Sequence, residues 1–223
     1  MKYLFRLVVY AVIFFFAFSV SYVLLLRVVP VTVMPVRIIR MFDGGSVSAF
    51  PQARWRPLGK ISNQMAAAVI ASEDNKFAEH KGFDWDAIEK ARKHNKNSNR
   101  IRGASTISQQ TAKNVFCTHR RTWLRKGFET YYTFLIETLW GKRRIMEVYL
   151  NVIETHRDVY GAEATARRFY NKKAAGLNAY EASMIATVLP NPHRMKLEAP
   201  SQYMVGRASR IRGIMNKLPK PQL

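Results

Sequence analysis

Glu73 is the residue whose type and position most favour acid–base chemistry. It follows Ala66, Val69 and Ile70 at the spacing i, i+3, i+4 and i+7, which places its carboxylate on the apolar stripe of a helix, near the helix end. Apolar surroundings remove hydration from a carboxylate and suit it to exchange a proton near neutral pH. From the spacing alone, a helix-terminal glutamate held in a salt bridge explains the same pattern.

A second set of charged residues also follows helical spacing. Arg121, Arg125 and Glu129 stand four residues apart, so they project from one helix face. An ordinary solvated Arg–Glu pair would account for them. The alternative is a phosphate site, in which Lys113 and Arg121 supply positive charge to a leaving group. An acid there repels phosphate unless a cation lies between, so we expect a divalent cation, Mg²⁺ or Mn²⁺, near Glu129.

Helices dominate the elements that must position these residues. The pattern becomes helical at Ser62, and Thr106 with Gln109 forms a capping box that opens a further helix. Period-two alternation is nearly absent, which predicts a mostly α domain. The helices are expected at 62–73, 84–92, 106–116, 122–140, 144–151, 162–170 and 178–189, with a last one around 204–215.

Two details of this pattern are specific enough to test. The segment from Lys93 to Arg100 is polar and basic, and we expect a loop there. The helix beginning at Thr122 is expected to turn an apolar face inward, made of Leu124, Phe128, Tyr131, Tyr132, Leu135 and Leu139.

The N-terminal segment reads as a membrane anchor. Leu7 to Leu26 is an uncharged run of about twenty residues, which as a helix spans roughly 30 Å, one hydrocarbon core. The sequence after it lacks the small-residue cleavage site of a signal peptide. We therefore expect an anchor with its juxtamembrane segment at 1–36, an irregular connector at 37–61 and one domain at 62–223. Basic residues flank both ends of the span, so charge does not decide its orientation.

The net charge narrows the classes of partner. The chain carries 36 basic and 15 acidic residues, a formal charge of +21, which suits anionic membrane lipids or polyanionic ligands. Nucleic acid is another partner for such charge, but an anchored domain whose basic residues are scattered among acids argues against it. The single cysteine, Cys117, excludes an intrachain disulfide.

Two longer motifs contain the residues above. Residues 73–84 read Glu-Asp-Asn-Lys-Phe-Ala-Glu-His-Lys-Gly-Phe-Asp, and residues 103–114 read Gly-Ala-Ser-Thr-Ile-Ser-Gln-Gln-Thr-Ala-Lys-Asn. Together they resemble the first two motifs of the peptidoglycan glycosyltransferases. Residues 125–129 resemble the third motif, Arg-Lys-x-x-Glu, and weaker similarity extends to Pro192. Ala104 departs from the family's second glycine.

The resemblance implies roles for individual residues. Glu73 matches the catalytic base and Glu129 the second conserved acid of the family. The positions that match substrate contacts are Asp74, Phe77, Ser105, Gln109, Gln110, Lys113, Asn114, Arg121 and Arg125. His80 belongs to the first motif and is expected to order its loop.

The resemblance also implies a fold and an activity. The fold would be a lysozyme-like α domain, of the monofunctional type because no Ser-x-x-Lys tetrapeptide is present. Lipid II and the growing glycan strand would be the substrates, with membrane lipids and cell-wall synthesis proteins as partners and no organic cofactor. The site would be the outer, periplasmic face of the cytoplasmic membrane. Two rivals are a lytic enzyme of similar fold, which leaves Gln110 and Glu129 unexplained, and a tethered nucleic-acid binder, which leaves Glu73 unexplained.

Overall fold

A computed structural model describes the whole chain except residue 33 and residues 36–54, 99–100, 119–121 and 220–223. Within the described residues the fold is mostly helical, as predicted. The elements are α1 (Lys2–Val28), η2 (Leu58–Lys60), α3 (Asn63–Glu73), α4 (Trp85–Lys96), α5 (Ile107–Phe116), α6 (Trp123–Leu139), α7 (Gly141–Val152), β1 (Glu154–His156), β2 (Val159–Tyr160), α8 (Ala162–Tyr170), η3 (Ala174–Gly176), α9 (Ala179–Val188) and α10 (Gln202–Met215).

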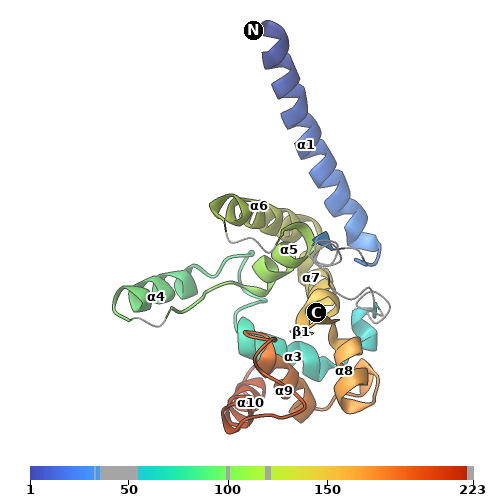
Figure 1. Cartoon of the computed structure of the whole chain (residues 1–223), viewed down its shortest axis with the longest axis vertical. Helices are drawn as coiled ribbons and strands as arrows, with labels where there is room; N and C mark the ends of the chain where they lie inside the picture. The colour runs from blue at the N-terminus through green and yellow to red at the C-terminus, as the bar shows by residue number, and fades with distance from the viewer. Residues whose placement is uncertain (33, 36–54, 99–100, 119–121, 220–223) are drawn as a thin grey trace.

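The helices form two packed groups around a shared core. In one group α5 lies against α6 and α7, and in the other α3 lies against α9 and α10 (Figure 1). Tyr149 and Ile145 of α7 and Met65 of α3 are fully buried in the same core cluster. The end of α3 and the start of α5 therefore meet between the two groups, which is where the first two sequence motifs lie.

Helix α1 stands out from the rest of the molecule as a long rod (Figure 1). Most of its side chains are exposed, but Ser19, Val23 and Leu26 are buried against the domain. Trp140 Nε1 donates a hydrogen bond to the carbonyl of Val23 at 2.8 Å, and Arg144 donates to that of Leu26. From Phe15 onward the apolar span is thus docked on the helical domain, and the residues before it are mostly exposed.

The capping box predicted at Thr106 is confirmed, and a second one is present. Thr106 and Gln109 form a capping box at the start of α5, and Asn178 and Glu181 form another at α9. In each box the N-cap side chain and the third helical residue satisfy two backbone N–H groups that the helix leaves free. Strands β1 and β2 form a short antiparallel hairpin with a register irregularity between Glu154 and His156, which the sequence pattern did not indicate.

Two predictions about element limits and faces are wrong. Helix α4 continues to Lys96, so Lys93–Lys96 is helical, and cations in a last turn favour the helix dipole. Leu124 and Phe128 of α6 are exposed rather than inward. The buried face of α6 holds Glu129, Thr133, Leu135 and Ile136 instead, and the Phe128 ring lies beside Phe15 of α1, 5.9 Å between centroids.

Candidate active site

Glu73 is the last residue of α3 and is half-buried. The apolar stripe predicted for this helix is confirmed, since Ala66, Val69 and Ile70 are buried. Asp74 follows with an extended backbone, φ −162°, so the chain turns away from the helix directly after Glu73. The carboxylate is therefore held where helix meets loop, between apolar core and surface.

Each oxygen of the Glu73 carboxylate accepts a hydrogen bond from a different side. Gln110 Nε2 of α5 donates to Oε2 at 3.0 Å, and Ser72 Oγ donates to Oε1 at 3.0 Å. The Gln110 side-chain oxygen in turn accepts from the Tyr149 hydroxyl at 3.2 Å. A chain of donors thus runs from α7 through α5 to the end of α3.

Tyr149 is a site residue that the sequence did not indicate. It is fully buried, and burial raises its pKa well above the ordinary value of tyrosine, with the charges of Glu73 and Asp74 adding to the effect. The hydroxyl therefore keeps its proton and remains a donor to Gln110. Helical periodicity could not indicate this contact, because Gln110 lies 39 residues away from Tyr149 in the chain.

Lys113 and Glu129 lie close enough to interact, as the phosphate-site prediction requires. Glu129 is buried, and both of its oxygens are paired: Arg125 Nη1 lies 2.5 Å from Oε2, and Lys126 Nζ contacts Oε1. Lys113 has no hydrogen-bond or ion-pair partner among the described residues. Burial lowers the pKa of Lys113, an effect that the negative charge of Glu129 opposes.

The described residues do not fit a metal ion held at Glu129. Both oxygens of this carboxylate face cationic partners, and no cluster of three metal-ligating side chains exists in the part of the chain that the structure describes. A requirement of the reaction for a divalent cation stays an untested prediction.

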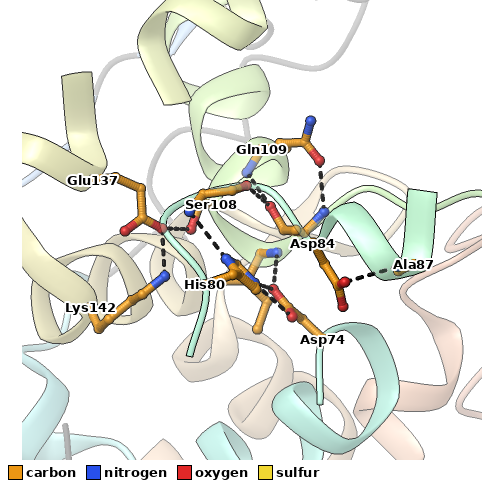
Figure 2. Close-up of polar contacts among 11 residues, drawn as sticks. Asp74, His80, Asp84, Ala87, Ser108, Gln109, Glu137 and Lys142 are labelled. Carbon is orange, nitrogen blue, oxygen red and sulfur yellow. Dashed lines mark hydrogen bonds and ion pairs between the residues drawn. The ribbon is translucent and has the colours of Figure 1, made fainter. Parts of the chain in front are cut away.

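The loop after Glu73 is fixed by the carboxylate of Asp74 (Figure 2). Asp74 is buried, accepts the backbone N–H of Ile107 at 3.0 Å and contacts His80 Nε2 at 3.0 Å. The Gly82 N–H donates to His80 Nδ1, so the imidazole proton is on Nε2 and donates to Asp74. The residue after the candidate base therefore ties the first motif to the start of α5, where the second motif begins.

Other residues of the first two motifs also support this junction. Phe77 is fully buried beside His80, with the Lys142 ammonium over its ring. Ser108 donates to the Glu137 carboxylate, which also pairs with Lys142 at 2.6 Å (Figure 2). Gln109 is buried and its side-chain oxygen accepts the Thr106 N–H.

The structure does not bring every predicted substrate contact to one place. Gln110 donates to Glu73, Arg125 pairs with Glu129, and Lys113 lies within electrostatic reach of both acids. By contrast, Asp74, Phe77 and Gln109 are buried in the fold. Ser105 is exposed just before α5, and Asn114 is half-buried one residue beyond Lys113. Arg121 lies outside the described residues. A direct contact of any of these residues with substrate stays a prediction.

Comparison with known proteins gives one consistent result. The family model described as Transglycosylase matches residues 43–216. Over 206 residues the chain is 51% identical to a protein of Bdellovibrio bacteriovorus named "Biosynthetic peptidoglycan transglycosylase", covering 92% of this chain and 82% of that protein. Relatives of the same name from Bacteroides thetaiotaomicron and Aeromonas hydrophila are 50% and 47% identical, covering 93% and 87% of this chain and 85% and 88% of theirs.

Proposed function

The chain belongs to the transglycosylase family, and from this premise we propose how its site residues carry out the reaction. It is a peptidoglycan glycosyltransferase, which joins the disaccharide units of lipid II into glycan strands for the cell wall. The observation that supports a role for Glu73 is its placement: a carboxylate at a helix end, hydrogen-bonded on both oxygens and near the half-buried Lys113.

In the proposed mechanism Glu73 is the general base. It takes the proton from the 4-hydroxyl of the acceptor GlcNAc as that oxygen attacks the anomeric carbon of the donor MurNAc. The new carbon–oxygen bond forms on one face while the bond to the diphosphate breaks on the other, so the configuration inverts from α to β. The bonding electrons leave with undecaprenyl diphosphate, and the proton stays on Glu73.

Lys113 is proposed to stabilise the departing diphosphate. Its side chain is half-buried, which reduces hydration of the ammonium, so a contact with an anionic ligand gains more free energy there than at the surface. Glu129 is proposed to act indirectly. Its buried carboxylate pairs with both Arg125 and Lys126, which holds two more cations beside Lys113 and reduces the repulsion among the three.

We infer that α1 anchors the protein in the cytoplasmic membrane. It is the one described helix long and apolar enough to cross a bilayer, which is compatible with a single span. We propose that the domain lies on the outer face of the membrane, where lipid II presents its disaccharide. The net charge of the whole chain, +21, favours contact with anionic lipid headgroups. Other cell-wall synthesis proteins are proposed as partners because strand synthesis precedes cross-linking.

Glu73→Gln tests the proposed base. The amide keeps the shape of the side chain but cannot accept a proton, and general-base catalysis typically contributes 10²–10⁴-fold. We expect polymerisation of lipid II to fall at least 100-fold while lipid II binding changes little. Glu79→Gln, an exposed acid of the same loop, is the matched control. Turnover above about a tenth of wild type in Glu73→Gln would end this assignment.

A further inference from the structure

Ser72, the residue before the proposed base, links Glu73 to the C-terminal helix. Its hydroxyl donates to Glu73 Oε1 at 3.0 Å and also lies 3.3 Å from the carbonyl oxygen of Ala186 in α9. Arg207 Nη2 of α10 donates to the same hydroxyl oxygen at 3.2 Å. Three segments that are far apart in the sequence therefore meet at one hydroxyl group beside the catalytic carboxylate.

The hydroxyl of Ser72 has one proton and two acceptors within reach. Since Arg207 donates to the oxygen, the proton of Ser72 is free to point to either acceptor. An ionised carboxylate accepts a stronger hydrogen bond than a backbone carbonyl, and the distance to Glu73 is also the shorter one. While Glu73 is ionised, the proton is therefore directed to it. Once Glu73 has taken a proton from substrate, the carbonyl of Ala186 offers the hydroxyl another partner.

Arg207 is an unusual residue for a helix that packs against α3 and α9. Its Nε is buried and has no hydrogen-bond partner in the described part of the chain. A buried N–H without a partner costs free energy, so an apolar side chain of similar length would satisfy packing better. Packing alone does not explain an arginine at this position, whereas its hydrogen bond to Ser72 does.

We propose that Ser72 and Arg207 are positioning residues for the polymerisation reaction, in which α10 holds the Glu73 carboxylate through the chain Arg207–Ser72–Glu73. This inference rests on the proposed role of Glu73 as general base. The Tyr149–Gln110 chain holds the other carboxylate oxygen, so the plane of the carboxylate is fixed from two sides. A base fixed in this way meets the acceptor hydroxyl in one orientation, and small errors of placement cost large factors in rate.

Ser72→Ala in the full-length protein removes the link at its centre. We expect kcat for lipid II polymerisation to fall about tenfold with KM within about twofold of wild type, because binding groups elsewhere in the site are untouched. Ser72→Thr keeps the hydroxyl and is expected to restore most of the rate. If Ser72 had a purely structural role, Ser72→Ala would lower the melting temperature instead. Ser72→Thr would then not restore kcat specifically.

Arg207→Met, which keeps the stem and removes the donor, tests whether Arg207 acts through Ser72. Alone it should lower kcat by a factor similar to that of Ser72→Ala. Combined with Ser72→Ala it should lower kcat no further, since both changes break the same chain. Arg210→Ala, an exposed arginine of the same helix, is the matched control and should leave kcat unchanged.

Two outcomes would overturn the inference. One is a Ser72→Ala variant whose kcat equals that of wild type. The other is a double variant whose fall in kcat is the product of the falls in Ser72→Ala and Arg207→Met. Glu73→Gln separates this failure from that of the proposed function. If Glu73→Gln is inactive while Ser72→Ala is fully active, the base assignment stands and only the positioning role falls. If Glu73→Gln is active, the base assignment falls, and the positioning role falls with it.

Discussion

The cationic residues of the site differ in whether an acidic side chain pairs with them. Arg125 and Lys126 share the carboxylate of Glu129, so each has an anionic partner and one of their two positive charges is offset inside the protein. Lys113 has no such partner among the described residues, and burial works against its charged form. An unbalanced, poorly hydrated ammonium stabilises an incoming anion most, which suits a leaving diphosphate.

The lowered pKa of Lys113 predicts a pH dependence. Because burial disfavours the ammonium, Lys113 loses its proton at lower pH than an exposed lysine, so the rate should fall at alkaline pH below the ordinary lysine value of 10.5. For stability the sign is opposite: burial of the ammonium costs free energy of folding below the lowered pKa, and this cost shrinks as pH rises from the lowered pKa to 10.5, where the unfolded chain loses its proton too.

The rate of Lys113→Arg as a function of pH measures this effect. Arginine keeps its charge throughout the accessible range, so the alkaline fall in rate should move to higher pH even where the rate at neutral pH is reduced. Lys126→Arg changes a lysine that is already paired with Glu129, and should leave the position of the alkaline fall unchanged. An alkaline limb that is identical in Lys113→Arg and wild type would count against a role for this ammonium.

At the scale of elements, the junction between α3 and α5 depends on one glycine. Gly82 has φ +90°, and a Cβ there would lie 2.9 Å from Thr133 Cγ2 and 3.0 Å from Glu137 Cγ of α6. Its carbonyl accepts the hydroxyl of Thr106, the N-cap of α5. Backbone conformation and close packing therefore both require glycine where the first motif passes over α6.

Gly82→Ala should accordingly destabilise the fold by about 1–3 kcal/mol, from left-handed strain and the forced shift of α6. Gly206→Ala is the matched control, since a Cβ there meets no atom within 4 Å and the position is inside α10. It should stabilise by about 0.5–1 kcal/mol through helix propensity. Thermal unfolding of both variants in detergent measures the expected loss of stability in Gly82→Ala and the expected gain in Gly206→Ala. A Gly82→Ala protein as stable as wild type would show that the junction tolerates a side chain.

The sequence predicted the local parts of this arrangement well. Most helix limits, the capping box at Thr106 and the apolar stripe below Glu73 depend on residues within one or two turns of each other. It could not predict that Asp74 accepts the N–H of Ile107, or that Arg207 donates to Ser72, because those contacts join residues 33 and 135 positions apart. The exposure of Leu124 and Phe128 was missed because the periodic pattern does not show which face of α6 meets α1.

At the scale of the whole molecule, α1 is both an apolar span and a packing element. Val23 and Leu26 belong to the main core cluster, and Ser19 lies 2.6 Å from the hydroxyl of Tyr131 in α6. By contrast Leu4, Phe5 and Phe14 are largely exposed. Removing residues 1–36, the simplest test of an anchor, would therefore uncover the core as well as release the protein from a membrane.

Two truncations separate these effects. Removal of residues 1–14 takes away the exposed half of α1 and leaves Ser19, Val23 and Leu26 in place. It should preserve the melting temperature in detergent and lower activity on bilayer-embedded lipid II much more than on detergent-solubilised lipid II. Removal of residues 1–28 also deprives Trp140 of its hydrogen bond to Val23, so it should lower the melting temperature and both activities. The shorter truncation decides the question: because it leaves the docked half intact, equal losses in the two assays would mean that the exposed half of α1 does not bring the site to its lipid substrate.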